Sequence, residues 1–124
     1  ADMPDRETIV RSIQIHCRAI SAHNKAAWLQ IWADDAEIED PVGVSTYRGI
    51  EAVSTGLWAE IEAIKPINLW LEKDIIVCGD EAIAILAAEV GSGQARRLVG
   101  PIVDHFTFNE DGKIAKMRAF WKYD

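Results

Sequence analysis

The hydrophobic residues in the first half of the chain recur at helical spacing. Over residues 5–23, apolar side chains fall three or four positions apart, which predicts an amphipathic helix. A shorter helix is predicted over 25–33, because Asn24 is suited to cap its N-terminus. A third helix is predicted over 49–65 and must end before Pro66, which cannot continue a helix.

From residue 67 onward the pattern changes to the alternation of apolar and polar residues that is typical of strands. Glycine-containing turns separate four predicted strands, over residues 67–78, 81–90, 95–109 and 113–123. A short earlier strand is predicted over 36–40. Helices followed by hairpin-connected strands predict an α+β fold, with the helices packed on one face of a curved sheet.

Length and charge narrow the class of protein. The 124 residues fit one domain, which we expect to cover positions 1–124. A net charge of −7 argues against a nucleic-acid partner, because phosphate binding needs a basic surface. We expect no contact with a membrane, since no apolar run approaches the ~20 residues that span a bilayer. The N-terminus shows no signal-peptide pattern, so a cytoplasmic location is expected.

The cysteines and histidines indicate neither a disulfide nor a metal site. Cys17 and Cys78 are far apart and lie in apolar contexts, so we expect buried free thiols in a reducing compartment. The three histidines, His16, His23 and His105, show no metal-ligand spacing, and no common metal motif occurs. The sequence therefore predicts no metal.

Asp104 is an acidic residue inside an apolar predicted strand. Ile102 and Phe106 share its parity, so alternation directs its carboxyl toward the core. A buried carboxylate without a partner is costly, so this group must be neutral, be paired, or line a cavity. A structural ion pair across the sheet, or exposure after a register shift, is the alternative. The arginines available as partners are Arg96, Arg97 and Arg118.

Asp40 ends the first predicted strand, directly before Pro41. Alternation places it on the same face as Ile38 and separates it from Glu37 and Glu39. It is either a base at the edge of a pocket or a residue that forms a turn. Two carboxyls in opposite environments, one ionised and one neutral, are typical of proton-transfer chemistry.

His16 and the aromatic residues bear on a binding site. His16 falls at the edge of the apolar stripe of the first helix, where a histidine either packs or faces a pocket. His105 has the opposite parity to Asp104 and is expected on the outer face of the sheet. The aromatic side chains either fill the core or line a flat apolar slot for a polycyclic or terpenoid ligand.

Three segments of the chain resemble the bacterial ketosteroid isomerases, within the NTF2-like (SnoaL-like) superfamily. They cover residues 32–43, 101–109 and 112–121, in matching order and spacing. The Asp-His-Phe run of the second segment, with Met-Arg-Ala in the third, is the most specific part. The resemblance implies an NTF2-like cone, in which a curved, mixed and mostly antiparallel sheet packs with three helices from the N-terminal half. It also implies a homodimer through the outer sheet face.

The resemblance further implies roles for the two aspartates. Asp40 matches the general base that moves a proton from C4 to C6 of a 3-oxo-Δ5-steroid. Asp104 matches a protonated acid that donates a hydrogen bond to the dienolate oxygen; ketosteroid isomerase is itself the standard example of such an acid. The family needs no cofactor, and its substrate is an apolar small molecule.

The resemblance also suggests which side chains contact the substrate. Trp121 and Phe106 are expected to flank the apolar ligand. Trp32 and Leu57 align with tyrosines that support the site in some members, so we expect both at the substrate.

The chain departs from the family at His16, which aligns with the oxyanion-hole tyrosine. Losing one oxyanion donor typically costs about 10²–10³ in rate, although a neutral imidazole can donate in its place. Between Pro101 and Asp104 the chain has one residue more than some relatives, and a bulge there could turn Asp104 out of the pocket. The leading interpretation is a slower isomerase or one with another enolisable substrate. A cyclase, dehydratase or epoxide hydrolase of the same fold, or a non-catalytic module for hydrophobic ligands, are the alternatives.

Overall fold

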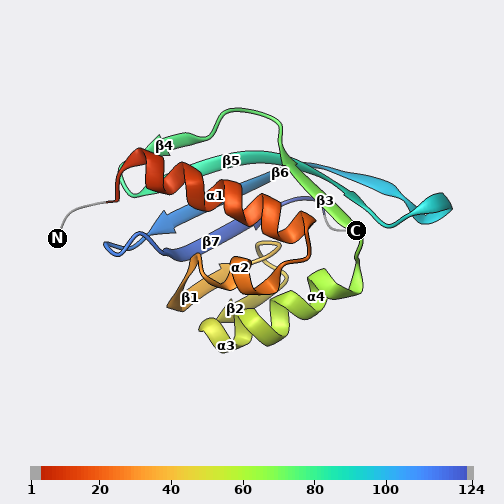
Figure 1. The fold of residues 1–124 in the computed structure, drawn as a ribbon, viewed down its shortest axis with the longest axis horizontal. Coiled ribbons are helices and arrows are strands. Elements are labelled where there is room, and N and C mark those ends of the chain that lie inside the picture. The colour runs from red at the N-terminus through yellow and green to blue at the C-terminus, as the bar shows by residue number, and fades with distance from the viewer. Residues whose placement is uncertain (1–3, 123–124) are drawn as a thin grey trace.

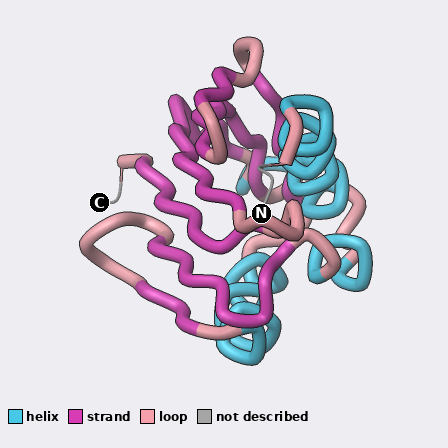
Figure 2. The backbone as a smooth tube through the Cα atoms, turned by 90° about the vertical axis from the view of Figure 1, so that its left-hand side faces the viewer, coloured by secondary structure: helices cyan, strands magenta, loops and turns pink. Residues whose placement is uncertain are grey.

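The computed structural model describes residues 4–122, and its strands form one curved sheet with the helices against one face (Figure 1, Figure 2). The strand order is β2-β1-β7-β6-β5-β3, and β4 also pairs with β5. β1 and β7 pair in parallel, whereas the other pairings between described strands are antiparallel. The helices are α1 (Arg6–Ser21), α2 (Lys25–Leu29), α3 (Ile50–Ala52) and α4 (Trp58–Ala63). The strands are β1 (Trp32–Glu39), β2 (Thr46–Arg48), β3 (Ile67–Leu71), β4 (Ile76–Cys78), β5 (Glu81–Val90), β6 (Arg97–Phe108) and β7 (Ile114–Phe120).

This arrangement confirms the α+β fold with a curved, mixed and mostly antiparallel sheet. The first helix begins where the sequence indicates, because the Asp5 carboxylate accepts a hydrogen bond from the Thr8 amide at 2.8 Å and caps the helix. Its buried residues Ile9, Ile13 and Ile20 face the sheet. No helix in the described range 4–122 is long and apolar enough to cross a membrane.

The second helix is shorter than predicted, and the first strand starts earlier. α2 ends at Leu29 and β1 already begins at Trp32. Trp32 and Ala33 are both buried, so the hydrophobic pattern fitted a longer helix as well as a strand. Strand pairing determines that this segment is a strand and not a helix. The Ile114 amide donates a hydrogen bond to the Ile31 carbonyl at 2.8 Å, which joins the segment to the sheet.

The third predicted helix is one helical stretch that changes its winding in the middle. A π-helical turn over Val53–Leu57 lies between α3 and α4. Such turns are often found at functional sites. Gly56 lies in this turn, and a side chain there would meet the ring of Tyr47 at 3.0 Å. Tyr47 belongs to β2, a strand of three residues that is too short to be recognised from alternation.

The long strand predicted over 67–78 is two strands, β3 and β4, separated by a charged segment that includes Lys73. Cys78, expected to be buried, is exposed because β4 is a short strand at the sheet margin. Cys17 is buried as expected, and burial raises the pKa of its thiol to about 12. The last strand ends at Phe120; Tyr123, included in the predicted strand, lies outside the described residues.

A bulge interrupts β6 near Gly100. Its pairing with β5 shifts by one residue between Leu86 and Ala88, and a side chain at Gly100 would lie close to the Ala87 methyl, 3.2 Å away. The bulge reverses the alternation of inward and outward residues. Leu98, which has the same parity as Asp104 in the sequence, is therefore 73% exposed. On the far side of the bulge the predicted parity holds, and Asp104 is only 4% exposed.

Candidate active site

A cavity of about 410 Å³ lies between the inner face of the sheet and the helices. This volume is within the range of small-molecule sites. Glu60, Ile64 and Arg97 are exposed where they line it, so this end opens to solvent. The side chains with ionisable or hydroxyl groups in its wall are His16, Asp40, Ser45, Tyr47, Glu60, Arg97 and Asp104. Within residues 4–122, no three His, Cys, Asp or Glu side chains are grouped so as to hold a metal ion.

Small residues of the sheet leave space around Asp104. This residue pairs with Ala84 on β5 and with Ala119 on β7, and both alanines are buried. Ala88 and Ala119 line the cavity wall. Because an alanine contributes a single methyl group, the volume that larger side chains would fill stays open beside the carboxyl.

Among residues 4–122, Asp104 forms no ion pair with an arginine. Arg96 contacts Glu89 at 3.9 Å and Arg118 contacts Glu39 at 3.4 Å. Arg97 lies at the exposed end of the cavity. The ion-pair alternative from the sequence is therefore wrong, and so is the concern that the bulge turns Asp104 away from the pocket.

His16 is the basic group beside Asp104. Its Nε2 atom lies 3.6 Å from Oδ2 of Asp104, and both side chains are nearly inaccessible to solvent. This separation is longer than a hydrogen bond. On its other side, Nδ1 of His16 accepts a hydrogen bond at 3.1 Å from the indole N–H of Trp28. The residue predicted at the edge of a helix stripe thus lies in the interior, between a tryptophan and an acid.

Asp40 is held by Trp121. The indole N–H of Trp121 donates to Oδ1 of Asp40 at 2.7 Å. Burial raises the pKa of Asp40 to about 6, and the hydrogen bond from Trp121 acts in the opposite direction. The carboxyl can therefore exchange a proton near neutral pH, as a general base must.

The backbones of Asp40 and Asp104 lie on either side of β7. Asp104 on β6 pairs with Ala119, while Glu39, next to Asp40, pairs with Arg118 on the other side of β7. Two inter-strand spacings separate their backbones, a distance of roughly 10 Å. Both side chains line the same cavity, so a small molecule between the helices and β7 can contact both.

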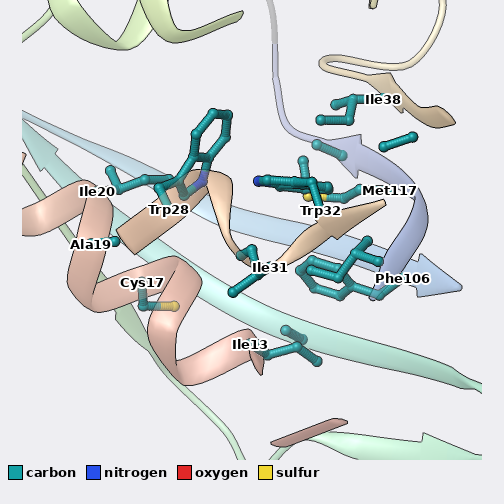
Figure 3. Close-up of a cluster of buried hydrophobic side chains, with 14 of the residues drawn as sticks. Ile13, Cys17, Ala19, Ile20, Trp28, Ile31, Trp32, Ile38, Phe106 and Met117 are labelled. Atoms are coloured by element: carbon teal, nitrogen blue, oxygen red, sulfur yellow. The ribbon is translucent and has the colours of Figure 1, made fainter. Parts of the chain in front are cut away.

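Two of the four predicted substrate contacts lie in the core instead. Trp121 and Leu57 line the cavity, but Trp32 and Phe106 do not. Figure 3 shows both in the buried cluster, where they are 3% and 0% exposed. Their rings meet the His16 ring nearly edge-on, with centroids 5.9 and 5.7 Å away. The physical reason is position along the strands: Phe106 lies two residues beyond Asp104 and packs against His16 of α1, and Trp32 begins β1 at the end away from Asp40.

Sequence reasoning missed two polar contacts of the cavity. Tyr47 lines it from β2, and burial raises the pKa of its phenol. Trp28 is one of the aromatic residues left open between core and ligand slot, and its side chain both lines the cavity and donates a hydrogen bond to His16. No local pattern marks either residue, because one lies on a very short strand and the other acts across the turn between α1 and α2.

The raised pKa of Asp40 predicts a cost in stability. A carboxyl whose pKa rises from 3.8 to about 6 on folding binds its proton more tightly in the folded state. The free energy of unfolding therefore falls as the pH rises from about 4 to 6. Asp40→Asn should be more stable than wild type by about 3 kcal/mol at pH 8 and close to it near pH 4. Denaturant titrations at both values measure this.

The control for this prediction is Asp34→Asn, since Asp34 is exposed on β1, the strand that ends directly before Asp40. Its unfolding free energy should match that of wild type at both pH values. An Asp40→Asn variant without a pH-dependent gain would contradict the raised pKa.

Comparison with known proteins identifies the family of this chain. A SnoaL-like domain model matches residues 13–117. The chain is 34% identical over 103 residues to a steroid Delta-isomerase of Nocardioides simplex, covering 83% of this chain and 80% of that protein. It therefore belongs to the SnoaL-like (NTF2-like) family, and its resemblance to the steroid isomerases within that family is confirmed.

Solved structures agree with this assignment. RV0760c from Mycobacterium tuberculosis superimposes with a TM-score of 0.83 at 28% identity, over 98% of this chain and 96% of that one. A second crystal structure of RV0760c, in complex with estradiol-17beta-hemisuccinate, gives a TM-score of 0.80 at 27% identity, over 94% and 95% of the two chains. The three helices and curved mixed sheet are thus the NTF2-like fold.

Proposed function

We propose that the protein is an isomerase that moves the C=C bond of a 3-oxo-Δ5-steroid, or of a similar apolar enone, into conjugation. The observation that carries this proposal is the placement of Asp40 and Asp104 on either side of β7, facing one apolar cavity. The similarity to a steroid Delta-isomerase supports the reaction. The complex of RV0760c with a steroid derivative supports the ligand class.

In this proposal Asp40 is the general base. Its ionised carboxylate takes a proton from C4, and the electrons of the broken C–H bond move toward the carbonyl oxygen to form a dienolate. Asp40 then returns the proton to C6, and the electrons flow back to restore the ketone. The hydrogen bond from Trp121 orients Oδ1, which leaves Oδ2 for the transfer.

Asp104 and His16 are proposed to stabilise the dienolate oxygen. Asp104 is buried and lines the cavity, and in this proposal it acts as the neutral acid that donates a hydrogen bond to that oxygen. Nε2 of His16 lies 3.6 Å away, so the two groups do not satisfy each other. A substrate oxygen in the cavity beside both groups can accept from each, and donors fixed in advance are the main source of rate enhancement in such sites. Trp121 and Leu57 would flank the apolar rings, and no cofactor takes part.

A spectrophotometric assay with 5-androstene-3,17-dione tests the proposal. The conjugated enone should appear with enzyme at a rate proportional to its concentration. If the folded protein binds the steroid without producing the enone, the isomerase proposal is wrong. A module that only binds a hydrophobic ligand then becomes the better description, which the loss of the oxyanion tyrosine at His16 favours. Epoxide hydrolysis is disfavoured, because Arg118 contacts Glu39 instead of lying between the two acids.

The raised pKa of Asp40 also predicts a pH profile. Because the base must be ionised, kcat/KM should increase tenfold per pH unit below about 6 and level off above it. Initial rates from pH 4.5 to 8, with enzyme stability checked at each pH, measure this. A profile without change between pH 5 and 7 would contradict Asp40 as the base.

The proposal also covers the domain, the location and the oligomeric state. Residues 1–124 would form one domain, the protein would act in the cytoplasm, and two copies would associate through the outer sheet face. Sedimentation of the purified protein tests the dimer, and fluorescence of a tagged copy in cells tests the location.

A further inference from the structure

Trp28 makes a hydrogen bond that determines where His16 can carry a proton. The indole N–H of Trp28 lies 3.1 Å from Nδ1 of His16, in a fully buried pair. An indole nitrogen is a donor and never an acceptor. Nδ1 of His16 must therefore accept, and an imidazole nitrogen that accepts carries no proton.

The remaining ring nitrogen of His16 then holds the proton. A neutral imidazole has one N–H, and with Nδ1 excluded it is on Nε2. Nε2 is the atom that faces Asp104, at 3.6 Å from Oδ2. Since this separation is too long for a hydrogen bond, the N–H remains available to an oxygen atom in the cavity that both residues line.

We propose that Trp28 is a positioning residue that fixes His16 as the neutral Nε2–H tautomer and so aims its one ring proton at the cavity beside Asp104. The opposite tautomer would direct a lone pair at the same place and would repel a negatively charged oxygen. The catalytic value of this arrangement rests on the proposed isomerase function, but the tautomer itself does not. The two ideas can therefore fail separately.

Two-bond proton–nitrogen correlation spectra of the ligand-free protein, labelled with ¹⁵N-histidine, test the tautomer. The pattern of cross-peaks between the ring C–H protons and the two nitrogens shows which nitrogen is protonated. We expect wild-type His16 to have a protonated Nε2 and a bare Nδ1 at neutral pH. A protonated Nδ1, or protons on both nitrogens, would overturn the proposal whether or not the protein turns over a steroid.

Trp28→Phe removes the donor, and Trp32→Phe is its matched control. Both tryptophans are buried and both rings pack near His16, but the indole nitrogen of Trp32 has no hydrogen-bond partner in the described structure. We expect the Nδ1–H form of His16 to become populated in Trp28→Phe and to stay absent in Trp32→Phe. An unchanged His16 spectrum in Trp28→Phe would refute a positioning role.

If Trp28→Phe does not fold, a variant that keeps the shape of the indole ring tests the same hydrogen bond. Benzothienylalanine at position 28 replaces the indole N–H by sulfur while keeping the size of the ring. It should change the His16 tautomer in the same way, and an unchanged spectrum again refutes the proposal.

Substitutions of His16 connect the tautomer to activity. A glutamine can accept from Trp28 through its carbonyl and donate through its amide, whereas a leucine can do neither. For the isomerase reaction we expect His16→Leu to lower kcat by as much as about 10²-fold, the lower end of the cost of losing an oxyanion donor. His16→Gln should recover most of this loss with KM nearly unchanged. Equal losses in the two variants would mean that the donated proton does not matter.

Discussion

Asparagine in place of Asp40 is expected to lower kcat for steroid isomerisation by about 10²–10⁴-fold, the usual contribution of a general base. The substitution is nearly isosteric, and an asparagine oxygen can still accept the hydrogen bond from Trp121. The shape of the cavity and the position of the side chain should therefore be retained. What is lost is the ability to take a proton from C4, so KM should change far less than kcat.

The measurement is the initial rate of enone formation over a range of steroid concentrations. Glu39→Gln is the matched control, because it neutralises the adjacent acid, which contacts Arg118 instead of lining the cavity. This control should retain activity close to that of wild type. If Asp40→Asn also keeps full activity, another group is the base and the proposed mechanism is wrong.

The second large effect is expected at Asp104. Asp104→Ala removes a proposed oxyanion donor and should lower kcat by about 10²–10³-fold. Asp104→Asn is more informative, because an amide can donate a hydrogen bond but cannot carry a negative charge. If Asp104 acts as a neutral acid, the asparagine variant should keep much more activity than the alanine variant.

Rates for both variants, with circular dichroism to confirm folding, decide this question. Equal losses in Asp104→Asn and Asp104→Ala would show that the enzyme needs the negative charge of Asp104 and not its proton. Wild-type rates in both variants would remove Asp104 from the mechanism. In either case the assignment of Asp40 could stand, because the two residues perform separate steps.

Much of the fold follows from periodicity, and the errors have identifiable causes. Alternation along β6 correctly predicts that Asp104 points inward. The prediction holds because the segment from Ile102 to Thr107 pairs with its neighbours without a register shift. The alternation does not continue to Leu98, because the bulge near Gly100 lies between the two positions. The early start of β1 was missed because Trp32 is buried in either a helix or a strand.

The candidate site was harder to predict than the fold. The cavity positions of Asp40, Asp104, Trp121 and Leu57 agree with what the family resemblance implied. The contact between His16 and Trp28 depends on how α2 returns against α1, a geometry that no spacing within either helix encodes. Trp32 and Phe106 lie in the core and do not line the cavity, because apolar character alone does not distinguish a core residue from a cavity wall.

The bulge at Gly100 divides β6 into two parts that can change independently during evolution. Arg97 and Val99 line the cavity on one side of it, while Ile102 and Asp104 line it on the other. Inserting or deleting one residue at this point would exchange the side chains at the open end and leave the buried acid in register. Related chains could therefore acquire new ligands by small changes in length here, without rebuilding the part of the sheet that carries the acid.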